Sequence, residues 1–299
     1  MRGWWQDLTD LVLPADCAGC GAPRTALCPR CRATLEGAAP RRVRPVPEPA
    51  GLPVVHAVAP YAAEVRALLL AHKERGALTL AGALGTALAR AVRAGLGHGG
   101  PGGGGSGAGA GAGGGSDGSP WRGPVLLVPV PSARWAVRAR GHDPVRRMAL
   151  AAAGELRRTG TPARVAAVLR QRRPVADQAG LDARRRLENL AGALEVTAGG
   201  GRLLGAGRLV LLDDLMTTGA SLAEAARALR QASVSRRDDE TAVYRAITRE
   251  GRGERNGVRP ERREWVHSAP EKALPNAPRR VLHAAVIAAP GDSFEINRN

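Results

Sequence analysis

The chain lacks the features of a membrane or exported protein. It contains no run of about 18 or more apolar residues, the length that a membrane-spanning helix needs. Its first residues include acidic side chains and no long apolar stretch, unlike a signal peptide. We therefore expect a cytoplasmic protein with no membrane span.

Lysine is almost absent from a strongly basic chain. The net charge is +17 over 299 residues, yet Lys73 and Lys272 are the only lysines among 44 basic residues. An arginine excess of this kind, together with abundant glycine, alanine and proline, is typical of a coding sequence biased toward G and C. A positive field attracts phosphates of any kind, so the charge indicates an anionic ligand without specifying nucleic acid.

Cysteine is absent after residue 31. The four cysteines form two Cys-x-x-Cys pairs separated by seven residues: Cys17, Cys20, Cys28 and Cys31. Two such pairs can surround one Zn²⁺ tetrahedrally, and a closed site of four thiolates is structural rather than catalytic. In a reducing cytoplasm this clustering favours a metal over disulfides. The alternatives are a redox dithiol or four unrelated free cysteines. The pattern leaves open whether this module contacts DNA, contacts a protein partner or braces the N-terminus.

Short apolar runs alternate with helical patterns along the chain. Residues 54–96 are typical of a strand followed by two helices, and residues 121–232 hold the densest alternation. An order of this kind predicts an α/β fold with a mostly parallel sheet flanked by helices. The remaining elements that we expect are strands at 125–128, 164–169, 209–212 and 281–288, and helices at 144–158 and 221–231.

Composition divides the chain into two parts and a tail. Residues 1–50 hold a short N-terminal helix and the cysteine module, and residues 54–290 form the α/β domain. We expect this domain to be interrupted by a Gly-rich linker at 97–120 and by a disordered insertion at 233–280. Residues 291–299 are expected to be a C-terminal tail.

The most informative stretch follows the strand at 209–212. Two carboxylates, a loop of small and hydroxyl residues and a helix start come in succession: Asp213, Asp214, Thr217, Thr218, Gly219, Ala220 and Ser221. Free backbone N–H groups at a helix start, with the helix dipole behind them, bind anions. Ser221 and Glu224 have the spacing of a capping box. The carboxylates should face sugar hydroxyls or a hydrated Mg²⁺, so the stretch suits a ribose 5-phosphate; the alternative is an ordinary strand–turn–helix.

This stretch resembles the ligand motif of the type I phosphoribosyltransferases. Within that superfamily the chain is most similar to the competence protein ComF family, over about residues 11–96, 121–232 and 281–290. The supporting blocks are the double Cys-x-x-Cys, Ala71–Gly76, Val128–Pro131 with Arg140-Gly141, Leu169–Asn189 and Asp213–Ser221. One departure is His142-Asp143-Pro144, where the family commonly has Phe-Asn-Gln.

The resemblance implies a Rossmann-like phosphoribosyltransferase fold that binds phosphoribosyl diphosphate (PRPP) with Mg²⁺. Asp213 to Ser221 would then hold the phosphoribosyl group, and four cations would hold the pyrophosphate: Arg134, Arg138, Arg140 and Lys73. An active protein would transfer the phosphoribosyl group with release of pyrophosphate, and the segment between Gln171 and Asn189 would close over the site. No catalytic residue can be assigned.

Two classes of function remain open on this evidence. One is a PRPP-dependent transferase, and the other is a non-enzymatic PRPP-binding protein that acts in DNA uptake beside a helicase-like competence partner. A zinc- and single-stranded-DNA-binding accessory protein of a DNA-processing complex is the alternative to both. The arginines near the cysteines fit DNA contact without requiring it: Arg24, Arg30 and Arg32.

Overall fold

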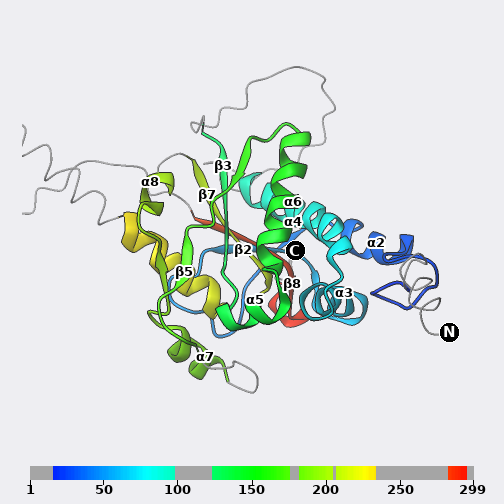
Figure 1. The fold of residues 1–299 in the computed structure, drawn as a ribbon, viewed down its shortest axis with the longest axis horizontal. Coiled ribbons are helices and arrows are strands. Elements are labelled where there is room, and N and C mark those ends of the chain that lie inside the picture. The colour runs from blue at the N-terminus through cyan, green and yellow to red at the C-terminus, as the bar shows by residue number, and fades with distance from the viewer. Residues whose placement is uncertain (1–15, 98–122, 176–181, 205–206, 234–281, 295–299) are drawn as a thin grey trace, which may run out of the picture.

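The computed structural model describes residues 16–97, 123–175, 182–204, 207–233 and 282–294 (Figure 1). The predicted N-terminal helix and the last five residues of the tail lie outside this part of the chain. The predicted linker at 97–120 and insertion at 233–280 also lie outside it, except for Gly97 and Ser233, each of which is the last described residue of a helix.

The main sheet has six strands, five of them parallel. The strand order is β1-β2-β8-β7-β3-β4, and only the pairing of β1 with β2 is antiparallel. The predicted α/β architecture with a mostly parallel sheet is therefore confirmed. The strands are β1 (Arg41–Val43), β2 (Val54–Pro60), β3 (Val125–Pro129), β4 (Ala163–Val165), β7 (Arg208–Leu215) and β8 (His283–Ala289).

Helices cover both faces of the sheet because its central strands are apolar on both sides. On β7, Val210 and Leu212 face a core that includes α3 (Ala63–Glu74), α4 (Ala81–Gly97) and α6 (Pro144–Arg158). Leu209 and Leu211 face the opposite core, formed with the helix over residues 220–233. The protein therefore has three layers (Figure 1).

The helix predicted at 144–158 has these bounds in the structure. Asp143 caps its first turn, because the Asp143 carboxylate accepts a hydrogen bond of 3.1 Å from the N–H of Arg146. Pro144 follows at the first helical position, where its missing N–H has no cost. The helix packs closely on α4 because Gly85 has no side chain: a Cβ there would lie 2.9 Å from the nitrogen of Ala152.

A two-stranded antiparallel sheet stands beside the main one. It consists of β5 (Leu169–Gln171) and β6 (Leu194–Val196). The prediction of one strand at 164–169 is wrong, since β4 ends at Val165 and the chain then turns away before β5. Three further helices lie around the sheets: α5 (Arg134–Arg140), α7 (Ala183–Leu190) and α8 (Gly200–Leu204).

The chain end packs into the domain further than the predicted tail boundary. A 3₁₀ turn, η2 (Gly291–Ser293), is followed by Phe294, which is buried and bridged to Val43 of β1. The Arg41 guanidinium lies 4.7 Å from the centre of the Phe294 ring. Residues 291–294 therefore pack with the domain, since Phe294 and Val43 lie in the same core cluster.

The strand order reverses between β3 and β7. From β3 the chain passes through α5 and α6 to β4 on one side, and from β7 it leaves through the helix at 220–233, while β8 lies on the other side. The two connections therefore leave the sheet in opposite directions, and ligands of open α/β sheets bind at the carboxyl ends of the strands at such a reversal. No described helix is long and apolar enough to cross a membrane.

Candidate functional site

Asp213 and Asp214 occupy the carboxyl end of β7, at the strand-order reversal. Both residues are buried. Asp214 faces α3, where its carboxylate meets Lys73. The N–H of Asp214 donates a hydrogen bond of 2.9 Å to Asp213 Oδ1. Burial, together with the neighbouring Asp214 charge, raises the pKa of Asp213 well above its usual range.

Lys73 meets this pair from the last turn of α3. Its Nζ lies 2.8 Å from Asp214 Oδ2, and the Asp214 side chain is only 8% exposed. Burial alone would lower the pKa of Lys73, but the charge and hydrogen bond of Asp214 and the charge of Asp213 raise it. The ammonium therefore stays protonated and compensates the buried carboxylates. A lysine predicted on the pyrophosphate side thus lies against the acids predicted to hold ribose.

The residues on either side of Lys73 contact two other helices, α5 and α6. Nε2 of His72 is 3.3 Å from the carbonyl oxygen of Pro144, the first residue of α6. The Glu74 carboxylate accepts a hydrogen bond of 3.0 Å from Arg140, the last residue of α5. Three consecutive residues of α3 therefore join the carboxyl end of β7 to α5 and α6.

The loop after β7 is shaped by a left-handed glycine. Gly219 has φ +75°, and a Cβ at this position would lie 3.1 Å from both methyl carbons of Leu52. Side chains other than glycine are strained in this conformation. Thr217 is exposed and Thr218 is half-buried, so their hydroxyls line the loop where solvent can reach it.

The predicted capping box is wrong. The helix begins at residue 220, so Ser221 lies inside it rather than at its cap. The Glu224 carboxylate turns away from the helix start and accepts a hydrogen bond of 2.9 Å from the N–H of Leu194 in β6. Burial would raise the pKa of Glu224, but hydrogen bonds from Arg227 and from backbone N–H groups lower it.

Glu224 and Arg227 together fasten the small sheet to the loop helix. Arg227 donates to the Glu224 carboxylate at 2.7 Å and to the carbonyl oxygen of Leu194 at 2.8 Å. Both backbone groups of Leu194 are therefore held by one helix. Apolar contacts of Leu190 and Ala193 with Ala220 continue this attachment up to the binding loop.

Arg186 of α7 adds a guanidinium that the sequence did not single out as a site residue. Its Nη1 donates to the Thr217 hydroxyl at 3.4 Å, and its buried Nε has no hydrogen-bond partner among the described residues. α5 and α7 lie at the same end of the main sheet (Figure 1). Glu74 was missed in the same way, because only the three-dimensional contact with Arg140 reveals it.

The three arginines predicted to bind pyrophosphate differ in their exposure to solvent. Arg140 is partly buried, bonded to Glu74, and close enough to Lys73 to oppose its protonation. Arg134 and Arg138 are exposed on α5, beside Trp135, which is 64% exposed. The structure thus brings Lys73 and Arg140 together with the aspartates and leaves the other two at the surface.

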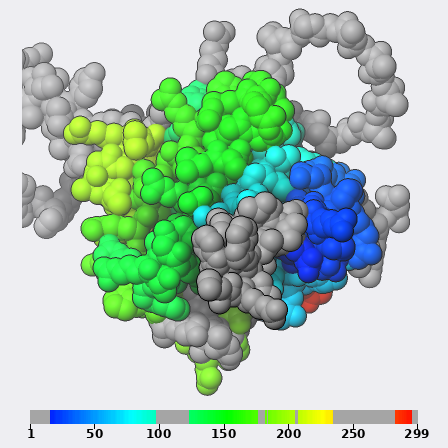
Figure 2. Space-filling model, turned by 45° about the vertical axis from the view of Figure 1, so that its right-hand side comes forward, coloured from blue at the N-terminus to red at the C-terminus, as the bar shows by residue number. Residues whose placement is uncertain are grey.

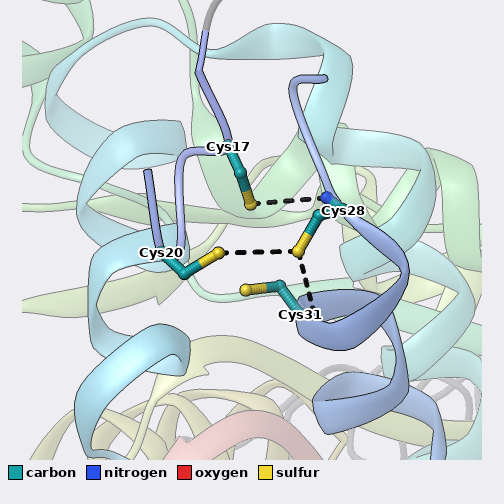
Figure 3. Close-up of side chains that lie close together, drawn as sticks. All are labelled: Cys17, Cys20, Cys28 and Cys31. Atoms are coloured by element: carbon teal, nitrogen blue, oxygen red, sulfur yellow. Dashed lines mark hydrogen bonds between the residues drawn. The ribbon is translucent and has the colours of Figure 1, made fainter. Parts of the chain in front are cut away.

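The four cysteines converge on one point (Figure 3). Their sulfur atoms all lie within 4.8 Å of one another, and the Sγ atoms of Cys20 and Cys28 are 3.5 Å apart. Sulfurs that surround Zn²⁺ tetrahedrally at about 2.3 Å are separated by similar distances. The arrangement fits a metal ion bound by four thiolates.

Backbone groups favour the thiolate form of Cys17, whereas burial and the neighbouring thiols raise the pKa of Cys31. Burial would raise the pKa of Cys17, but N–H groups of Cys28, Cys20 and Gly19 lower it to about 6. The N–H of Cys28 donates to Cys17 Sγ at 3.3 Å, and that of Cys31 donates to Cys28 Sγ at 3.4 Å. Hydrogen bonds of this kind orient and stabilise metal-binding thiolates.

The cysteine module packs into the main core. Cys31 and Leu35 of α2 (Pro29–Glu36) are fully buried in the cluster that also contains Leu68 of α3 and Leu84 of α4. Arg90 of α4 donates to the carbonyl oxygen of Leu35 at 3.0 Å. The module lies directly against these helices on one flank of the molecule (Figure 2).

No protein-family model matches this chain, and no curated protein matches its sequence significantly.

Proposed function

We propose that this chain binds PRPP, or a closely related phosphoribosyl diphosphate, at the carboxyl ends of β3 and β7. The observation that carries the proposal is the combination of a loop at a helix start with buried carboxylates and two cations at one strand-order reversal. Few ligands would use all three groups. PRPP would use them, because it carries a phosphate, a vicinal diol and a diphosphate on one five-carbon sugar.

Each group of the site has a role toward this ligand. The loop from Thr217 to Ser221 holds the 5-phosphate with backbone N–H groups and hydroxyls. Asp214 and Asp213 accept hydrogen bonds from the ribose hydroxyls, while Lys73 keeps their combined charge low. Arg140 binds the diphosphate, because two N–H groups of a guanidinium match two phosphate oxygens. Mg²⁺ would enter with the diphosphate as part of the substrate complex.

The reaction that this ligand supports is phosphoribosyl transfer. A nucleophile forms a bond to C1 of the ribose while the bond from C1 to the diphosphate oxygen breaks, and the electron pair leaves with pyrophosphate. The nucleophile gives up its proton to solvent. Positive charge develops on the ribose ring in such a step, as in glycoside cleavage, so the buried carboxylates near the sugar would favour it. No side chain of the proposed site is assigned as a base.

We propose Zn²⁺ as the occupant of the cysteine cluster, with a structural role. Four thiolates leave no open coordination position for a substrate. The module shares its core with α3, and α3 carries Lys73. This packing favours a brace for the domain over an independent DNA-binding finger. A role in DNA uptake beside a helicase-like partner rests on the family resemblance and stays a prediction.

Calorimetry with PRPP and Mg²⁺ tests the proposed function. We expect binding by the natural protein and its loss in an Asp213→Asn, Asp214→Asn double variant. A Glu36→Gln, Asp292→Asn variant changes the net charge equally, at a half-buried and an exposed position outside the proposed site, and should bind normally. A folded natural protein that does not bind PRPP would exclude the proposal.

A further inference from the structure

Two of the four cations predicted to bind pyrophosphate, Lys73 and Arg140, lie near the aspartates at the carboxyl end of β7. Carboxylates of the protein already neutralise both of them. Lys73 pairs with Asp214 at 2.8 Å and Arg140 pairs with Glu74 at 3.0 Å. The two pairs differ in their surroundings. The Asp214 side chain is 8% exposed, so separating it from Lys73 would leave a buried charge without a partner.

The second pair can exchange its carboxylate for another anion. The Glu74 side chain is 48% exposed, so its carboxylate can return to water when it leaves Arg140. Arg140 itself is only 18% exposed, so its guanidinium needs a negative partner in place of Glu74. Arg140 is therefore the cation that an entering anion can take over.

We propose that Glu74 is a specificity-determining residue, which occupies Arg140 until a diphosphate displaces it. A diphosphate offers more negative charge than a carboxylate and two oxygens for the guanidinium fork, so it competes successfully. A sugar monophosphate held by the loop after β7 carries no diphosphate to pair with Arg140 and gains nothing. Glu74 thus lowers the affinity for every diphosphate ligand and leaves that for monophosphates unchanged. This inference rests on the proposed function.

The test compares three ligands in the Glu74→Gln variant, with Mg²⁺ held constant. By calorimetry, PRPP and inorganic pyrophosphate should bind about three- to tenfold more tightly than to the natural protein. The affinity for ribose 5-phosphate should change less than about twofold. Glu36→Gln is the matched control, because Glu36 is also a helical glutamate with a solvent-accessible side chain, 37% exposed, paired with an arginine, Arg32, and its loss changes the net charge equally.

A double-variant cycle tests whether Glu74 acts through Arg140. In an Arg140→Ala background, Glu74→Gln should no longer tighten pyrophosphate binding, and circular dichroism melting verifies that each variant is folded. Unchanged or weaker pyrophosphate binding by Glu74→Gln would overturn the inference, as would an equal gain for all three ligands or a gain that survives Arg140→Ala. Absence of PRPP binding by both the natural protein and the variant would instead refute the proposed function.

Discussion

Lys73 Nζ lies 2.8 Å from Asp214 Oδ2, although α3 and β7 are far apart in the sequence. The contact joins a helix end on one face of the sheet to the carboxyl end of a central strand. It supplies the positive charge that two adjacent buried carboxylates need in order to share one site. The predictions below follow from this charge arrangement and from the elements that hold it in place.

Replacing Lys73 by methionine should destabilise the protein and weaken PRPP binding. Asp214 would keep its burial and lose its counter-charge, which we expect to cost about 1–2 kcal/mol in the free energy of unfolding. This figure is below that for a fully buried pair because Lys73 is 36% exposed. Urea denaturation measures the loss. Adding Asp214→Asn to this variant should recover most of it, and a further loss would contradict the pairing.

Asp213→Asn should stabilise the fold at neutral pH. The folded state raises the pKa of Asp213, so stability falls as the pH rises from about 4, the pKa of an exposed aspartate, through the folded pKa. The amide removes this penalty. We expect a Tm higher by about 2–4 °C at pH 7 and no difference from the natural protein below about pH 4. A lower Tm at pH 7 would show that the Asp213 carboxylate stabilises the fold.

Glu224→Gln should have the opposite pH dependence. The folded state lowers the pKa of Glu224, so its contribution is present above about pH 4.3 and is lost as the pH falls through the folded pKa. We expect a loss of about 1–2 kcal/mol at pH 7, since the buried carboxylate binds Arg227 and the N–H of Leu194. Chemical denaturation at several pH values measures it. Glu188→Gln, which changes an exposed pair with Arg184, is the control and should have little effect.

Gly219→Ala should disturb the loop more than the fold. The positive φ costs an alanine about 1 kcal/mol, and the added methyl group would press on Leu52 at 3.1 Å. We expect PRPP affinity to fall at least tenfold while Tm falls by only a few degrees. Gly160→Ala is matched, because Gly160 also has a positive φ and a Cβ there meets no atom within 4 Å. Equal PRPP affinity in both variants would contradict the role of the loop.

Metal analysis should find one zinc ion per chain, released when the four thiols are titrated. The chain contains no other cysteine, so the stoichiometry is unambiguous. Chelation or Cys31→Ser should lower Tm by about 10 °C or more, because Cys31 is fully buried in the main core. An Arg24→Ala variant, changed at the surface of the same module, should melt like the natural protein. A chelated protein with an unchanged Tm would exclude a structural metal.

Patterns of several consecutive residues were predicted well. The strands at 125–128 and 209–212 and the helix at 144–158 are all present, because an unbroken apolar run and a proline-led helix start are local signals. Strands of three residues were missed or merged, among them β1, β5 and β6. So short a segment carries no period of its own, and it becomes a strand only where a partner strand accepts its hydrogen bonds.

The sequence alone determined which chemical groups are available: four cysteines with metal-binding spacing, and a loop of two acids, hydroxyls and glycine after a buried strand. Tertiary structure decided their partners. It placed Lys73 on Asp214, Glu74 on Arg140, and Glu224 on β6 instead of on its own helix start. The physical reason is that covalent spacing governs contacts within one turn or loop, whereas ion pairs across a sheet depend on which elements pack together.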